Sequence, residues 1–437
     1  MSGAICAERL LSPAAEQWLF QEENDVHRRN CAPGAAAVLA ALLVLSTVAR
    51  AEDNDLRVFY DNGLHLETED TDVALKFGGR IQLDAATFSR GGIPAPLDAF
   101  DDGTEFRRAR LYFSGTIHDN VEFKAQYEFA GGDADFKDVW LGLKDLPVIN
   151  HLRFGHQKEP FSLEELTSSK YITFMERALP NLFAPGRNTG VATFNTASHG
   201  RLWWGGGVFT ETDSFGNNTD LDGGPNITGR ISGLPLYRGD GAELLHVGLS
   251  VTDKGIPGGR IDLAGRPEAH LASKFLSTGD ILADSLNVYD AEIAYVRDRF
   301  SAQGEFMIAD LDAPAGADPS FSGGYAYVSF FLTHDRRAYK KSSAAFDRVK
   351  PAENFGKGGK GAWEIAVRYS MADLSDTGVL GGELDDLTFG VNWYLNPNTR
   401  FMLNYVMADL ERRGDGMGGI IETDDFDAVM ARWQIDF

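Results

Sequence analysis

Basic side chains recur at alternating positions in several stretches of the sequence. In VALKFGGRIQLDAATF, Arg80 lies on the face opposite to Ile81 and Leu83. In RRARLYFSGTI, Arg108 and Arg110 lie on the face opposite to Ala109 and Leu111. Lys124 in VEFKAQYEFA and Arg368 in AWEIAVRYSM follow the same pattern. The planar fork of arginine can hold two oxygens of one anion, and lysine adds a point charge. This chemistry is the electrostatic binding of oxyanions, with no bond made or broken.

The alternation itself indicates β-strands. Polar and apolar residues alternate in windows of about ten residues that are separated by Gly, Asp, Asn and Pro. A soluble β-sandwich also alternates, but its strands are shorter and fewer. In a membrane barrel the apolar face meets lipid and the polar face lines a wet lumen. Aromatic residues at the ends of the apolar faces fit the interfacial girdles of such a barrel: Phe88, Phe129, Trp363 and Trp393.

A sheet that lies in lipid must close on itself, because unpaired edge groups are too costly there. Residues 52–437 leave room for about 16 strands with their turns. The sequence therefore predicts an all-β, transmembrane, antiparallel β-barrel of about 16 strands. A barrel of that size leaves an aqueous channel.

The N-terminal region has the features of a secretory signal peptide. The apolar run GAAAVLAALLVLSTVA follows the basic HRRN and precedes a small-residue cleavage site at Ala51. Residues 1–51 are therefore expected to form an N-terminal extension and signal peptide, and residues 52–437 the barrel. Residues 1–25 are acidic and mixed, unlike the start of a signal peptide, so translation from Val26 stays open as an alternative.

Composition and motifs argue against several other functions. The net charge of −23 does not suit nonspecific binding of nucleic acid. Cys6 and Cys31 both precede residue 52, which suits a chain that crosses an oxidising compartment. The sequence has no HExxH or GxSxG motif, and GKGGKG lacks the context of a phosphate-binding loop. We therefore expect no catalytic residues, no metal and no cofactor. A barrel phospholipase would need a Ser/His pair on the outward-facing side, but His246 and Ser250 share a polar face. An adhesin or receptor would need much longer loops or a plug domain, and the sequence shows neither.

Residues 158–190 interrupt the alternation. The stretch KEPFSLEELTSSKYITFMERALPNLFAPGRNTG contains three prolines and is long for a turn, and long loops are often functional. Its charges are nearly balanced, which weakens the case for a strong anion filter. The cations are Lys158, Lys170, Arg177 and Arg187, and the anions are Glu159, Glu164, Glu165 and Glu176.

Several stretches resemble the phosphate-selective porin O and P family. They include FKDVWLGLK, RFGHQKEPFSLEELTSSKYITFMERALP, FFLTHDRRAYKKSSAAFDRVKP and LDDLTFGVNWYLNPNTRFMLNYVMADL, in the order of the family and over roughly residues 73–437. The resemblance implies a 16-stranded barrel in a Gram-negative outer membrane, with the 158–190 loop folded inward as a constriction. It also implies a homotrimer that passes small anions, such as phosphate or polyphosphate, by passive diffusion.

Eight cations are therefore candidates to line the pore and bind anions: Arg80, Arg108, Arg110, Lys124, Lys170, Arg177, Arg187 and Arg368. The alternative is that inward cations pair with inward acids such as Asp84, Glu122, Glu128 and Glu364, which would give a general or weakly selective porin. Outer-membrane lipid and lipopolysaccharide are the other expected partners.

The chain ends in the alternating stretch FDAVMARWQIDF. We expect Trp433, Ile435 and Phe437 to face lipid while Arg432 and Gln434 face the lumen, and we expect this strand to pair with the first strand. The pattern also resembles the signal that the outer-membrane assembly machinery reads on barrel proteins.

Overall fold

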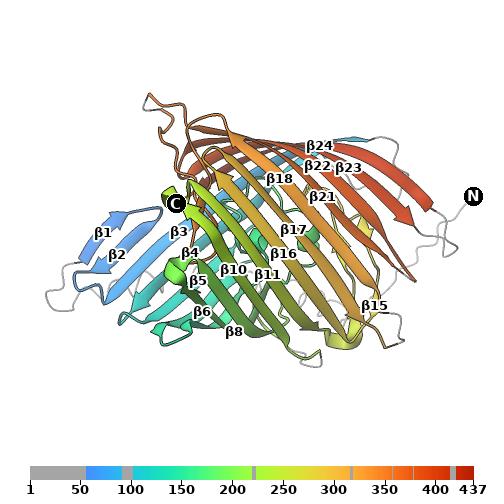
Figure 1. The fold of residues 1–437 in the computed structure, drawn as a ribbon, viewed down its shortest axis with the longest axis horizontal. Coiled ribbons are helices and arrows are strands. Elements are labelled where there is room, and N and C mark those ends of the chain that lie inside the picture. The colour runs from blue at the N-terminus through green and yellow to red at the C-terminus, as the bar shows by residue number, and fades with distance from the viewer. Residues whose placement is uncertain are drawn as a thin grey trace, which may run out of the picture. The chain divides into compact units, whose positions relative to one another are not determined.

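A computed structural model describes most of the chain as one unit (Figure 1). The described residues are 56–90, 102–218, 223–314, 318–356, 358–376, 378–413 and 420–437. The expected signal peptide and its cleavage site at Ala51 lie outside them. No helix in the described part of the chain is both long and apolar enough to cross a membrane.

Sixteen antiparallel strands form a closed ring, which confirms the predicted fold class. Each strand pairs with its neighbour in the sequence, and β24 pairs with β3 to close the ring. The strands are β3 (Val73–Arg90), β4 (Gly103–Ile117), β5 (Val121–Glu128), β6 (Asp135–Leu146), β7 (Asn150–Lys158), β8 (Arg187–Ala197), β9 (Leu202–Thr210), β10 (Asn226–Arg238), β11 (Glu243–Gly255), β16 (Ser285–Arg297), β17 (Phe300–Asp312), β18 (Ser320–Phe331), β21 (Ala362–Asp376), β22 (Val379–Asn396), β23 (Thr399–Arg413) and β24 (Ile420–Asp436).

A short hairpin extends the sheet beyond the barrel. Its strands β1 (Leu56–Tyr60) and β2 (Leu64–Thr68) pair with each other, and β2 also pairs with the first residues of β3. Figure 1 shows the hairpin projecting beside β3, past the tilted strands of the wall.

Side-chain alternation decides which residues face outward. On β3, Ile81 and Leu83 are 41 % and 42 % exposed, whereas Gln82 between them is fully buried. On β24, Trp433 is 49 % exposed and Gln434 only 3 %. The apolar side chains thus cover the outer surface, where lipid replaces water, and the polar side chains point into the barrel.

The seam between β24 and β3 is held by backbone and side chains. Arg432 lies opposite Asp84, and its Nε and Nη2 donate to the two carboxylate oxygens over 2.7 and 2.6 Å. Beyond the last paired residue, the Gly79 N–H donates to the Phe437 carbonyl over 2.6 Å, and the Phe437 N–H donates back over 3.1 Å. The Phe437 ring lies so close to Gly79 that a Cβ there would be 2.8 Å from it.

Short turns connect the strands at one end of the barrel, and longer segments lie at the other end. The inner loop, residues 159–186 between β7 and β8, carries α3 (Leu163–Leu166) and the 3-10 turn η2 (Leu179–Leu182). Two pairs of two-residue strands lie between β11 and β16: β12 (Arg260–Ile261) with β15 (Ile281–Leu282), and β13 (Ala264–Gly265) with β14 (Leu276–Ser277). Single 3-10 turns stand at η3 (Ser198–Gly200), η4 (Gly239–Gly241) and η5 (Pro257–Gly259).

One connection at the short-turn end is long. The 332–361 segment, between β18 and β21, contains the hairpin β19 (Ala338–Lys340) with β20 (Ala345–Asp347). It reaches into the barrel, because the Arg230 guanidinium on β10 donates to the Ala344 carbonyl over 2.9 Å. The lumen is therefore narrowed by chain segments from both ends.

We predict that Phe437→Ala lowers the amount of folded barrel in the outer membrane several-fold and leaves the single-channel conductance of the assembled protein unchanged. The ring packs against Gly79 at the seam and is 39 % exposed on the outer face of the barrel. Heat-modifiable mobility on a gel measures folded protein, and bilayer recording measures conductance. A normal level of folded variant would contradict the prediction.

Candidate functional site

The inward faces of β3 to β9 surround a cavity of about 550 Å³, together with the inner loop and the 332–361 segment. We call it the cationic cavity. It is lined by nine arginines and lysines but by only two carboxylates, Asp138 and Asp347. The cations are Arg80, Arg108, Arg110, Lys124, Arg153, Lys158, Arg177, Arg187 and Lys340. This excess of positive charge occurs in a chain whose net charge is −23.

The cations of this cavity differ in how far they are neutralised. Arg110 pairs with Glu128, and Arg187 pairs with Asp138, its Nε 2.8 Å from the carboxylate. Lys124 contacts the same Asp138, so two cations share one acid. Arg80 instead donates to the Ser169 hydroxyl over 2.7 Å. No carboxylate within the described residues lies within ion-pair distance of Arg80, so its charge is available to an anion.

A second cavity of about 310 Å³ lies against residues 176–182 of the inner loop. We call it the loop-side cavity, because residues 264–274 between β11 and β16 form part of its wall. Arg107, Arg266 and Lys274 line it, together with two carboxylates, Glu176 and Glu268.

Only two of the lining residues are shared by the two cavities, Arg108 and Arg177. These two arginines therefore mark the constriction between the cavities. The Arg177 guanidinium is fixed by the carbonyls of Glu164, Glu165 and Thr167, each about 3.1 Å away. Arg108 donates to the Gln82 side chain over 2.9 Å.

The barrel wall grips the backbone of the inner loop. Six carbonyl oxygens between residues 169 and 176 accept hydrogen bonds from inward side chains of β3, β21, β22, β23 and β24. The pairs are Gln82 with Ser169, Gln434 with Lys170, Arg400 with Ile172, Asn392 with Thr173, Arg432 with Met175 and Arg368 with Glu176. Phe174 and Met175 are themselves buried. The loop is thus fixed along its length, so the constriction has a defined width.

The first turn of the inner loop is held by a carboxylate from the opposite wall. Glu305 on β17 accepts hydrogen bonds from the Ser162 hydroxyl and from the N–H groups of Leu163 and Glu164, at 2.6, 3.0 and 2.8 Å. The two N–H groups are donors at the N-terminus of α3 that have no partner within the helix, and the negative charge of a carboxylate is favourable there.

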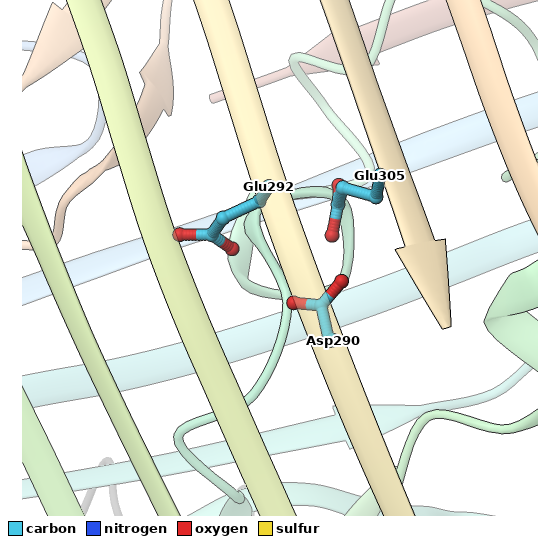
Figure 2. A group of neighbouring side chains, drawn as sticks. All are labelled: Asp290, Glu292 and Glu305. Atoms are coloured by element: carbon cyan, nitrogen blue, oxygen red, sulfur yellow. The ribbon is translucent and has the colours of Figure 1, made fainter. Parts of the chain in front are cut away.

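Glu305 belongs to a group of three buried carboxylates, with Asp290 and Glu292 on β16 (Figure 2). Glu292 is neutralised by Arg230, whose Nη2 is 2.7 Å away, and it also contacts His246. Asp290 accepts one hydrogen bond from Ser250, and its Oδ1 has no hydrogen-bond partner. The oxygens of Glu305 are already occupied by the inner loop, so this group serves as an anchor for the loop.

The inner loop separates the charges that the sequence shows as balanced. None of its four glutamates lines the cationic cavity. Glu159 accepts a hydrogen bond from Asn188 on β8, and Glu164 pairs with Arg368 on β21. Glu165 pairs with Lys158 and Arg177 at 2.8 and 3.2 Å, and Glu176 faces the loop-side cavity.

Six of the eight candidate cations line the cationic cavity, namely Arg80, Arg108, Arg110, Lys124, Arg177 and Arg187. Lys170 lies beside it, with its Nζ 3.5 Å from Asp436. Arg368 does not have the expected position: it is 1 % exposed and lines neither cavity. Its guanidinium pairs with Glu268 and Glu164 and lies over the Phe174 ring, so it holds the loop.

Other lining residues were not among the sequence candidates. Arg107 is brought inward beside Arg108 by a β-bulge, where the register of β3 and β4 shifts between Gln82 and Leu83. Alternation assigns Arg107 to the outer face, so no sequence signal marks it. Arg153 on β7 does follow the alternation and could have been found. Lys340 lies in the 332–361 segment, whose polar and apolar residues do not alternate regularly, so the sequence did not mark it.

A closed 16-stranded barrel with an aqueous, charged lumen defines an outer-membrane channel protein. The chain matches the family described as phosphate-selective porin O and P over residues 75–437, and it belongs to this family. It is therefore a porin of the Gram-negative outer membrane.

Porin O of Pseudomonas aeruginosa is 26 % identical, over 94 % of this chain and 99 % of the relative. A protein of Caulobacter vibrioides is 30 % identical, over 79 % and 71 %. Among solved structures, the anion-selective porin of Comamonas acidovorans has a TM-score of 0.52 at 14 % identity, over 84 % of this chain and all of that one. OmpT of Vibrio cholerae in its trimer form has a TM-score of 0.50 at 12 % identity, over 83 % and 99 %. At these identities the two structures share the fold alone.

Replacing Glu305 should loosen the constriction. In Glu305→Gln the amide keeps one acceptor oxygen for four donors, so about 1–3 kcal/mol of loop anchoring is lost. We expect noisier and larger single-channel currents. The control is Glu243→Gln, at the short-turn end of β11, where the side chain pairs with the exposed Arg238. Equal current noise in both variants and the wild type would contradict this role.

Anion selectivity should depend on pH near neutrality. Lys170 lies in the inner loop, outside the membrane-spanning strands, and burial and then the positive charge of Arg80 lower its pKa to about 7. Asp436 opposes this shift, while Arg348 and Lys124 add to it. Because the ammonium is charged below its pKa, the anion-to-cation permeability ratio should fall by about twofold from pH 6 to pH 8. Lys170→Met should have the low ratio at both pH values; a pH response that persists in this variant would assign it to another group.

Proposed function

We propose that this porin lets small anions diffuse passively across the outer membrane and favours oxyanions such as phosphate. The observation that carries the proposal is the lining of the cationic cavity, with nine arginines and lysines to two carboxylates. Such a wall raises the local concentration of anions and repels cations, whatever the net charge of the whole chain.

The donors around Arg80 support a preference for oxyanions. Arg80, Ser168 and Ser169 lie together at the wall of the cationic cavity, next to Arg108 and Arg110. Hydroxyl and guanidinium donors at fixed positions match an ion with several oxygens better than a single spherical ion. The description of the family adds support for phosphate, and the row of cations along the cavity would also suit polyphosphate.

The path would run between the two cavities through the gap at Arg108 and Arg177. Short turns of outer-membrane barrels face the periplasm and longer loops face outward. The cationic cavity, which includes residues 340–347 from the short-turn end, would then open toward the periplasm. The loop-side cavity would receive anions from outside.

A general or weakly selective porin is the second candidate. The pairs of Arg110 with Glu128 and of Lys124 and Arg187 with Asp138 favour it, because paired charges attract a passing ion less. Arg153 is paired in the same way, with its Nε 3.0 Å from Glu122. Arg80 and Arg108 therefore remain as the cations on which selectivity would depend most.

The assembled state is part of the same proposal. We infer a homotrimer, supported by the trimer form of the OmpT structure, with outer-membrane lipid and lipopolysaccharide around the apolar outer face. We further propose that residues 52–437 form the mature barrel after cleavage near Ala51, and that Trp433, Ile435 and Phe437 are read by the assembly machinery. The family and the fold are those of a channel, which leaves no role for a catalytic group in this scheme.

The zero-current potential of the reconstituted channel in a KCl gradient tests the proposal. We expect the sign of an anion-selective channel and a reduction of the chloride current by added phosphate. Arg108→Ser should lower the anion-to-cation permeability ratio by about threefold, because this guanidinium stands at the constriction.

The matched control is Arg238→Ser, since Arg238 lies at the exposed end of β10 and pairs with Glu243. It removes the same charge outside the lumen and should leave the ratio unchanged. A cation-selective potential in the wild type would overturn the proposal, and an anion-selective channel that phosphate does not block would leave only the weakly selective alternative.

A further inference from the structure

We propose that Glu176 is a resident competitor in the constriction, a carboxylate that occupies the arginines there between passages of anions. It makes the channel discriminate against ions that offer a single contact, such as chloride, and in favour of ions that offer two oxygens. This inference rests on the proposed function and assigns the residue that sets its specificity.

The contacts of Glu176 are those of a bound oxyanion. Arg107 holds both carboxylate oxygens, with Nε and Nη2 each 2.9 Å away. Arg432 donates a further hydrogen bond of 2.7 Å, and Arg108 stands 3.9 Å from the carboxylate. A phosphate ion bound at this point would use the same guanidinium forks.

The pair can be reached from the lumen. The side chains of Arg107 and Glu176 are 19 % and 14 % exposed, and both line the loop-side cavity. Arg108, beside them, lines both cavities. Within the described residues, Glu176 is the single carboxylate in ion-pair distance of Arg107. An anion that crosses the constriction therefore meets these arginines with Glu176 already in place.

The side chain of Glu176 can leave its partners without moving the loop. Its backbone carbonyl accepts a hydrogen bond of 3.0 Å from Arg368, which is itself fixed by Glu268. Arg432 keeps two hydrogen bonds to Asp84 at the barrel seam. Arg368 and Arg432 therefore keep their other partners when the carboxylate of Glu176 swings away. The exchange of Glu176 for a passing ion then involves the fork of Arg107 and the charge of Arg108.

The exchange favours oxyanions for a chemical reason. A phosphate can replace both hydrogen bonds of the Arg107 fork at once, so no donor is left unpaired. Chloride offers one point of contact, so a displaced Glu176 leaves a donor of the Arg107 fork without an acceptor at a site that is mostly shielded from solvent, which is costly. The return of Glu176 then displaces the bound oxyanion, which satisfies the requirement that an ion in a channel must also leave.

The test compares chloride and phosphate in the wild type and in Glu176→Gln, both as the full-length channel in planar bilayers. Conductance against KCl concentration gives the half-saturating concentration of chloride, and inhibition by added phosphate gives the half-blocking concentration of phosphate. With the competitor removed, chloride should half-saturate at a concentration about tenfold lower. Phosphate should change less, so the chloride-to-phosphate ratio of these concentrations should fall by about fivefold or more.

Two further variants make the result decisive. Glu176→Asp keeps the charge but shortens its reach to the fork, and should lower the ratio by about threefold. Asp298→Asn makes the same change of charge on an exposed turn between β16 and β17 and should leave the ratio unchanged. If Glu176→Gln does not assemble, Glu176→Asp gives the result.

The outcomes separate this inference from the proposed function. A wild-type channel that is cation-selective or insensitive to phosphate overturns both. An anion-selective, phosphate-blocked wild type with an unchanged ratio in the Glu176 variants overturns the role of Glu176 alone. A merely structural role would widen the pore and raise both conductances without changing the half-saturating concentration of chloride, and this result also overturns it.

Discussion

The function of this barrel depends on the hydrogen bonds by which its wall holds six backbone carbonyls of the inner loop, between residues 169 and 176. A loop that crosses an aqueous lumen exposes backbone groups that water would otherwise satisfy, and here Gln82, Arg368, Arg400 and their neighbours satisfy them instead. Because these donors are buried and fixed by strands, the loop has one position. The width of the constriction and the places of Arg108 and Arg177 follow from that position.

The same grip explains why an acidic protein can have a basic lumen. The loop divides the interior into two regions. Cations such as Arg80 and Arg153 line the cationic cavity, whereas carboxylates such as Glu159 and Glu305 are buried away from it. Carboxylates accept from backbone N–H groups and arginines donate to carbonyls, so both kinds of charge take part in the fold. In the proposed function, only the charges that face one of the two cavities take part in selecting ions.

The sequence predicted the barrel and its strand number because alternation and strand length are local properties. The break in alternation marked residues 158–190, but the inward fold of this loop was implied by the family resemblance alone. It placed Arg80, Arg108 and Lys124 inward for the same reason. It could not place Arg107, because one bulge reverses the alternation, nor tell that Arg368 holds the loop, because that depends on Glu268 a hundred residues away. The nearly equal numbers of acids and cations along residues 158–190 were likewise uninformative, because the acids and the cations differ in where their side chains point.

The seam between β24 and β3 has a consequence for the order of assembly. The strands that grip residues 169–176 include the last four of the barrel, and the ring closes only when Arg432 meets Asp84. The constriction is therefore completed by the last four strands of the barrel. A barrel that lacks its final strands has an open edge and also an inner loop without most of its donors, so pore width and membrane insertion are achieved together or not at all.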